Sequence, residues 1–400
     1  MDPLLLLAAA FLGLVAFVLT YRFPEWWLAI GCLFKFTADQ YLFLSQIGTA
    51  LIAAALVLAM LHSSRVSVVP RGLAVLAVVL PVWLAARTFA VPGGEDASQF
   101  LMCAAAATTA VWCARARRPL ATALAGATAL FLGLSLGLGQ TDASGDRFEG
   151  ISGNPNRLVS PILMGLPAVV HVAMTPRHRL LRVGAAAVAV LIVLTALRTQ
   201  SSQGIAAMVV IAACLAYGWY KKSPTRLPAA VFGVGVAAAL AWSNRERFQF
   251  SEDEEDAATW SGRIPLFKRA WEVIQDNALF GTGLTHFDAG EHIDRSSHNV
   301  TLSIGLISGI PGMAVWLLLL GGSLVLALRA LGKQAHWAAG AAAVAILSVT
   351  QTLEIMPLMW AILAHVCGWA WVQNDQPDPD LDDRDDLVVS TGGSTRVPAS

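Results

Sequence analysis

Residues 259–283 read T-W-S-G-R-I-P-L-F-K-R-A-W-E-V-I-Q-D-N-A-L-F-G-T-G, and residues 296–312 read S-S-H-N-V-T-L-S-I-G-L-I-S-G-I-P-G. Both runs belong to one long polar excursion in a chain that is otherwise strongly apolar. Apolar runs long enough to cross a bilayer stand before and after it. The sequence therefore predicts a membrane bundle that carries its polar chemistry in this segment.

The composition excludes a soluble enzyme. Of 400 residues, 56% are apolar and 14% are charged, and the mean hydropathy is +0.61. Soluble domains carry about 25% charged residues, so we expect an all-α, polytopic integral membrane protein. The formal net charge of zero gives no general attraction to nucleic acid. The five cysteines form no C-x-x-C pair and are predicted to be small buried hydrophobic residues.

Apolar runs of roughly 20 residues, the length that crosses about 30 Å of hydrocarbon, recur along the chain. We expect about 12 or 13 spans, because the segment 26–38 is short and contains Lys35. The predicted division is an N-terminal transmembrane bundle of about 10 spans (1–242), an extracytoplasmic catalytic loop (243–297), C-terminal transmembrane helices (298–373) and a disordered tail (374–400). The expected spans are 3–20, 26–38, 41–62, 72–91, 98–114, 119–139, 157–175, 179–197, 203–220, 228–242, 300–330 (broken at 309–312), 335–353 and 356–373.

Lysine and arginine gather in alternate loops, which predicts the orientation. The loops near 65–71, 115–118, 177–182, 221–226 and 329–333 hold several cations each, whereas those near 93–96, 141–156 and 198–202 hold few. We place the first set in the cytoplasm. The segment 243–297 then lies outside a bacterial plasma membrane, and the acidic tail lies inside.

Arginines on the outer side are scarce and therefore need a reason. Four of them are Arg157, Arg198, Arg263 and Arg269. Each alone is explained equally well by a side chain that extends to the lipid headgroups. If several converge, they form an anion site, because guanidinium groups match phosphate oxygens.

The run 263–276 has the apolar spacing of an amphipathic helix at the outer interface. Ser261 is the expected N-cap, and Pro265 is tolerable only in the first turn. An ordinary surface helix has the same pattern. The expected apolar face contains Ile264, Phe267, Trp271 and Ile274.

His298 lies at the start of an apolar run, where Ser296 or Ser297 is expected to cap a helix and leave His298 in its first turn. The positive end of a helix disfavours imidazolium. A neutral imidazole accepts a proton, as a general base must. The alternative is a histidine that only caps or packs.

Metal sites have little support in the sequence. His286 and His292 share the outer loop without a ligand spacing, and the acidic run 252–256 is typical of a solvated loop.

Together these motifs resemble the signature of the O-antigen ligase and polysaccharide polymerase superfamily, over about the second half of the chain. The matching residues are Ser261-Gly-Arg263, Trp271, Asn277-Ala-Leu-Phe-Gly281-Thr-Gly283, His298-Asn299, Gly309-Ile-Pro-Gly312 and, upstream, Gly153-Asn-Pro-Asn156.

The resemblance implies a glycosyltransferase that takes a glycan from undecaprenyl diphosphate and needs no cofactor, neither a nucleotide sugar nor a metal. The acceptor is a hydroxyl of a glycan, glycolipid or protein. By position, His298 matches the catalytic histidine and Arg263 a diphosphate-binding arginine. Gln203 stands where many members have a second arginine, so Arg198 or Arg157 is expected to replace it. Asn156, Asn299, Gln203 and Arg269 are expected to support the site.

Three alternatives remain open. A polymerase of the same superfamily joins repeat units instead of transferring a finished chain. A secondary transporter requires ionisable residues near the membrane midplane, of which Lys35 and Glu354 are candidates. A non-catalytic protein of envelope assembly is the third alternative, if the departure at Gln203 removes activity.

Overall fold

The computed structural model describes residues 23–37, 41–63, 72–92, 97–141, 147–175, 179–223, 260–284, 286–288, 294–349, 351 and 353–374, with isolated positions between 225 and 239. The expected span 3–20, the acidic run 252–256 and the tail after 374 lie outside the described residues, and the expected span 228–242 lies largely outside them.

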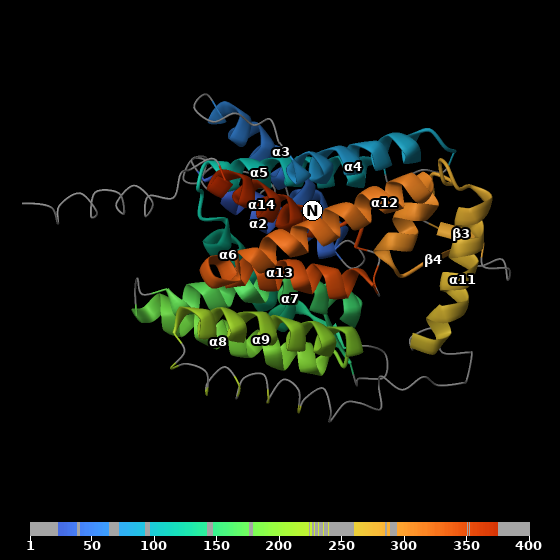
Figure 1. Cartoon of the computed structure of the whole chain (residues 1–400). Helices are drawn as coiled ribbons and strands as arrows, with labels where there is room; N and C mark the ends of the chain where they lie inside the picture. Colours follow the sequence, from blue (N-terminus) through green and yellow to red (C-terminus); the bar gives the residue numbers. More distant parts are fainter. Residues whose placement is uncertain are drawn as a thin grey trace, which may run out of the picture.

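The described chain is a bundle of roughly parallel and antiparallel helices (Figure 1). Seven of the described helices are long and apolar enough to cross a membrane: α3, α5, α6, α7, α8, α9 and α12. The expected polytopic helical membrane fold is thus confirmed. The helices are α2 Pro24–Phe34, α3 Leu42–Leu61, α4 Leu73–Phe89, α5 Ala97–Arg115, α6 Leu120–Leu138, α7 Pro155–Met174, α8 Arg179–Arg198, α9 Ser202–Lys222, α11 Trp260–Asp276, α12 Val300–Arg329, α13 Leu331–Ser348 and α14 Pro357–Asn374.

The segment 26–38 does not cross the membrane as one helix. Helix α2 has 11 residues, so it is about 16 Å long, and only a 3-10 turn, η1 Lys35–Thr37, extends it. Gly31 of α2 lies against Gly48 of α3, where an added Cβ would be 2.8 Å from the Gly48 carbonyl oxygen. Small residues permit such close helix approach inside lipid.

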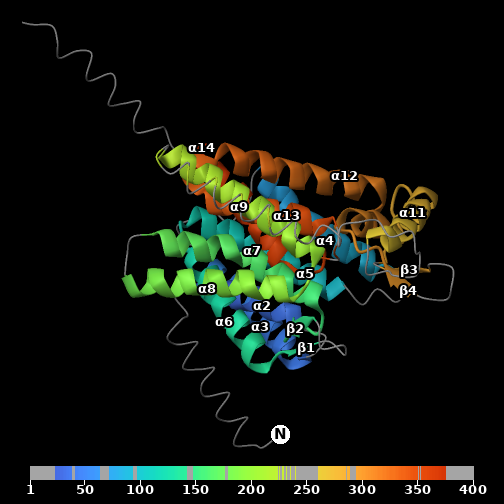
Figure 2. The same ribbon diagram turned by 90° about the horizontal axis from the view of Figure 1, so that it is seen from below.

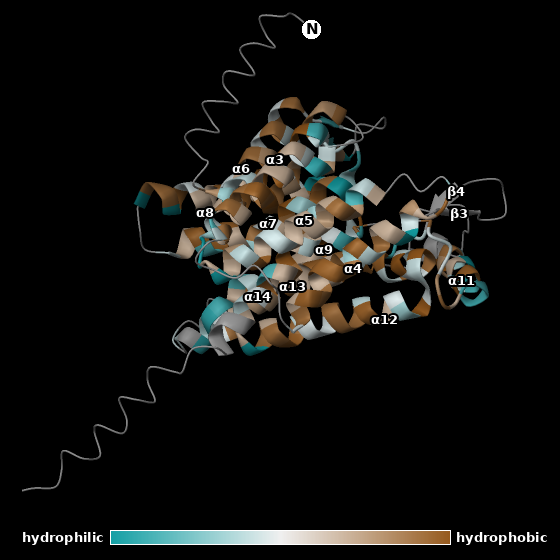
Figure 3. Ribbon diagram, turned by 90° about the horizontal axis from the view of Figure 1, so that it is seen from above, coloured by the Kyte–Doolittle hydropathy of each residue, from teal (hydrophilic) through white to brown (hydrophobic). Residues whose placement is uncertain are grey.

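The centre of the bundle is formed by α5 and α14, and α13 packs beside α9. Trp112, Trp316 and Trp360 are fully buried there. The peripheral helix α8 instead exposes Leu180, Val183 and Val190, and Figure 3 shows its largely hydrophobic colouring. An apolar, exposed helix face is what a lipid-facing helix requires.

Two short hairpins, which the sequence analysis did not predict, lie between helices. Strands β1 Gln140–Thr141 and β2 Phe148–Gly150 pair between α6 and α7, and β3 His286–Asp288 pairs with β4 Asp294–Ser296 between α11 and α12. All five cysteines are free, as expected.

Candidate functional site

Three helices begin with a polar cap at the end of the bundle predicted to face outward. Asn154 caps α7, Ser201 caps α9 and Asn299 caps α12, each with a side-chain oxygen that accepts a backbone N–H of the first turn. Each helix start carries roughly half a positive charge. Several starts at one end therefore favour an anion there.

Gln351, in the loop between α13 and α14, joins two of these helix starts. Its Nε2 donates to the backbone oxygen of Asn156 (3.1 Å) and to Oε1 of Gln203 (2.8 Å). Its Oε1 accepts from the hydroxyl of Ser160 (2.6 Å). Gln351 and Gln203 are 6% and 5% exposed, so this amide contact is buried and costly to break.

The turn that carries His298 reaches the same loop. Asn299 donates from Nδ2 to the backbone oxygen of Val349 (2.9 Å), two residues before Gln351. The loop 349–351 therefore contacts the starts of α7, α9 and α12. It brings together three expected site residues that are far apart in sequence: Asn156, Gln203 and Asn299.

The expected position of His298 inside the first turn is wrong. The N-cap is Asn299, whose Oδ1 accepts from the backbone of Leu302 (3.1 Å), so His298 precedes the helix. The Ser297 hydroxyl instead contacts the Ser303 hydroxyl (2.8 Å), and both serines are buried. His298 is half-buried and has a left-handed backbone with φ of 50°. Asparagine caps as well as serine does, and here the serine is used for packing.

Two of the expected arginines lie next to these helix starts. Arg157 is half-buried in the first turn of α7. Arg198 ends α8, four residues before α9, and lines a cavity of about 720 Å³ together with Leu136, Phe148 and Leu194. Arg147, which the sequence analysis missed, donates from Nε to the backbone oxygen of Thr199 (3.2 Å) and so holds the turn after Arg198.

Helix α11 packs on the first half of α12 with a face that shares only Ile274 with the expected apolar face. Leu266, Ala270 and Ile274 are buried with Leu306 of α12, whereas Ile264 and Trp271 are each 39% exposed. The helix starts at Trp260, so Ser261 is not its N-cap and Pro265 lies beyond the first turn. The exposed Ile264 and Trp271 suit a helix at the membrane interface.

Arg263 lies on the backbone of α11 three residues before Leu266. Leu266 and Leu302 belong to one apolar cluster, and Leu302 is four residues after His298. Arg263 and His298 are thus three and four residues in sequence from the contact between α11 and α12.

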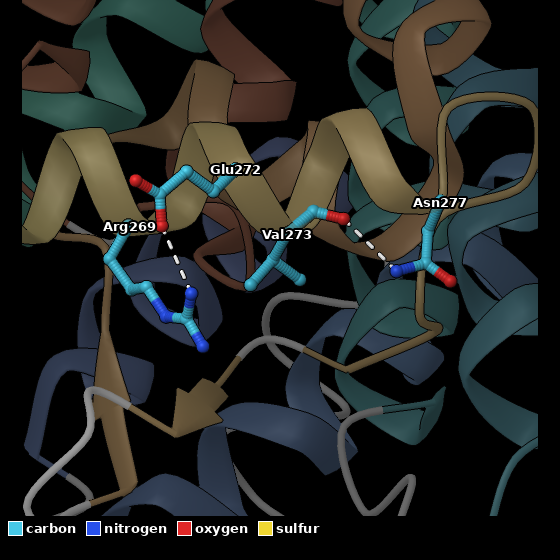
Figure 4. A network of polar contacts seen from close by, with 4 residues as sticks. All are labelled: Arg269, Glu272, Val273 and Asn277. Atoms are coloured by element: carbon cyan, nitrogen blue, oxygen red, sulfur yellow. Dashed lines mark hydrogen bonds and ion pairs between the residues drawn. The ribbon is translucent and has the colours of Figure 1, made fainter.

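The Arg269 side chain is turned toward Glu272 of the same helix (Figure 4). Its Nη1 lies 3.0 Å from Oε2 of Glu272, and both side chains are at least half exposed. This exposed ion pair already satisfies the guanidinium in part. The supporting role of Arg269 stays a prediction.

The Asn277–Gly283 motif fills a break in α12. Gly309 has non-helical φ and ψ of 72° and −170°. The backbone of Thr282 donates to Leu306 (2.6 Å), that of Gly283 donates to Ile307 (3.1 Å), and that of Ile310 donates to Ala278 (2.8 Å). These bonds satisfy backbone polar groups next to the break. The Asn277–Gly283 motif and the Gly309–Gly312 motif therefore form one structural unit.

Arg87, in the last turn of α4, also contacts this unit. Its Nε donates to the backbone oxygen of Phe280 (3.0 Å), and its guanidinium lies 5.6 Å from the centre of the Phe280 ring. The scarcity of outer arginines, applied to the end of span 72–91, could have identified it. Gln351 gave no such signal, because its three partners lie far away in sequence.

A family model described as O-antigen ligase matches residues 187–317. This range contains Arg198, Gln203, Arg263 and His298, and it includes the paired motifs around Gly281 and Gly309. This part of the chain is therefore similar to the O-antigen ligase family, which supports the resemblance that its motifs indicated. No curated protein matches the chain.

Proposed function

We propose that the protein is an O-antigen ligase-type glycosyltransferase, which moves a glycan from undecaprenyl diphosphate to an acceptor hydroxyl at the outer membrane face. One observation carries this proposal above the others. The loop 349–351 contacts the turn that carries His298 and also the helix starts beside Arg157 and Arg198.

The donor fits the outer end of α8. A polyprenyl diphosphate needs cations for its oxygens and an apolar surface for its chain. Arg198 lines the cavity of about 720 Å³ whose other walls include Leu136, Leu191 and Leu194, on a helix with an exposed apolar face. In this proposal Arg198 and Arg157 neutralise the diphosphate, and Arg263 approaches it from α11.

His298 then acts on the acceptor. Its imidazole removes the hydroxyl proton as the acceptor oxygen attacks the anomeric carbon. The bond from that carbon to the diphosphate oxygen breaks, and the diphosphate leaves on its carrier with the bonding electron pair. Attack opposite the leaving group predicts inversion at the anomeric carbon.

Replacement of His298 tests the mechanism. His298→Asn keeps a residue that tolerates the left-handed turn but removes the base, and His298→Ala removes both. We expect both variants to insert, to lose transfer and to accumulate lipid-linked glycan. His62→Ala is the matched control, because it removes an imidazole at the C-terminal end of α3, away from the proposed site. Undiminished transfer in His298→Asn would remove the imidazole from the mechanism.

Product analysis separates ligase from polymerase. Loss of a ligase leaves long, unattached chains on the carrier lipid. Loss of a polymerase leaves acceptors with single repeat units instead. The second pattern, together with dependence on His298, would assign the polymerase reaction to the same site.

A further inference from the structure

A second cavity lies at the opposite end of the bundle from the His298 turn. It has a volume of about 360 Å³ and lies between the turn after α5, the start of α13 and the end of α14. The end of α14 and the start of α12 lie at opposite ends of the bundle (Figure 2). Its lining includes Arg117, Arg118, Gln334, Trp337, His365 and Trp369.

The backbone presents the two arginines at the rim. After α5 the backbone of Arg117 is left-handed, with φ of 52°. Its N–H donates to Ala114 (3.2 Å), and the N–H of Arg118 donates to Cys113 (2.9 Å). The Arg118 guanidinium also lies 5.5 Å from the centre of the Trp112 ring. This helix-ending turn therefore projects two consecutive guanidinium groups into one cavity.

The remaining lining is amphipathic. Trp337 and the buried His365 lie with ring centres 4.2 Å apart, and Leu120, Ala121 and Trp369 supply apolar walls. A free inorganic anion gains little from such walls. A molecule with a phosphate and an attached acyl or glycerol part contacts both kinds of lining.

One acidic group lies near the rim. Glu25, at the start of α2, is fully buried and interacts electrostatically with Arg118. Neither of its carboxylate oxygens forms a hydrogen bond with the described residues, so Glu25 does not fix Arg118 through a hydrogen bond. Both guanidinium groups therefore remain in the lining of the cavity.

We propose that this cavity binds the headgroup of an anionic phospholipid, with its phosphate between Arg117 and Arg118 and its glycerol part against Trp337 and Trp369. The charge asymmetry places this end in the cytoplasm, where basic pockets between membrane helices attract anionic lipids. The site is distinct from the proposed transfer site, so the two proposals fail independently.

Thermal unfolding of the full chain with added phosphatidylglycerol, phosphatidylcholine or inorganic phosphate tests this proposal. We expect phosphatidylglycerol alone to raise the midpoint. Native mass spectrometry should show about 30-fold weaker phosphatidylglycerol binding in Arg117→Gln/Arg118→Gln, from the loss of two surface cations. Arg329→Gln/Lys333→Gln removes the same charge from the same end and should bind as the unaltered protein does.

Four outcomes would overturn the assignment. Equal shifts with the two lipids would leave no headgroup selectivity, and a full shift with inorganic phosphate would indicate a free-anion site. Equal losses in both double variants would reduce the effect to overall charge. A shift with a synthetic peptide of residues 375–386, but none with phosphatidylglycerol, would assign the cavity to this acidic segment. If the double variant does not fold, phosphatidylglycerol binding is measured with Arg117→Gln alone, a single change at the rim.

Discussion

Replacing Gly309 by alanine tests whether the Asn277–Gly283 motif is held by the break in α12. The backbone of Gly309 lies in a region that only glycine adopts readily, at a cost of about 1–3 kcal/mol for other residues. An added Cβ would lie 2.5 Å from the Ala278 oxygen and 2.8 Å from the Leu279 carbonyl carbon. Since both neighbours are backbone atoms, the motif must move.

The size of the effect follows from the bonds that this movement breaks. Three backbone hydrogen bonds join the motif to α12, and each contributes about 0.5–1.5 kcal/mol. Together with the backbone strain, Gly309→Ala should destabilise the docked motif by about 3–7 kcal/mol. The cost falls on local undocking, because most of the bundle core does not involve these residues.

Amide hydrogen exchange at Thr282 and Gly283 measures this undocking directly. At the lower end of the range, exchange should accelerate about 100-fold. Gly321→Ala is the matched control, because it lies in the same helix with no atom within 4 Å of the added Cβ. Exchange in Gly309→Ala within threefold of the unaltered protein, or equal to that in Gly321→Ala, would refute the reasoning.

Three further substitutions test the site. Arg263→Lys keeps the charge but loses the planar guanidinium, so we expect transfer to fall about tenfold or more in a donor-turnover assay. Unchanged kinetics would reject bidentate binding of the diphosphate by Arg263. Gln351→Leu removes the Nε2 donor that reaches the buried Gln203 oxygen and the Asn156 carbonyl, which should cost about 2–4 kcal/mol in thermal unfolding. An unchanged midpoint would show that the amide contact does not organise the helix starts. Arg87→Gln loses charged hydrogen bonds to the Phe280 and Gly281 carbonyls, which contribute about 1.5–3 kcal/mol each. Limited proteolysis should therefore cut faster between α11 and β3. Equal cleavage rates would show that Arg87 does not fix the Asn277–Gly283 motif.

Span positions were predictable because hydropathy is a local property. The expected 119–139 and 157–175 correspond to Leu120–Leu138 and Pro155–Met174. Each run is about one membrane thickness long and ends at polar residues. The break at 309–312 was also visible, since glycine and proline interrupt an otherwise continuous apolar run.

Partners across the fold were not predictable. The face of α11 that packs on α12 is Leu266–Ala270–Ile274, which shares Ile274 with the expected face but is otherwise rotated, although both have the same helical period. The choice depends on the shape of α12, which the local pattern does not contain. Gln351 pairs with Gln203 and Asn156 over 148 and 195 residues of sequence separation, and only the bundle topology determines such a pairing.

The junction between the two motifs also sets an order of assembly. Residues 277–283 are synthesised before α12, yet their backbone bonds require the break at Gly309. These backbone hydrogen bonds can form only after α12 has been synthesised and inserted. This segment of the nascent chain must therefore wait for a later helix, and chains truncated before residue 310 would carry it unanchored and open to proteases.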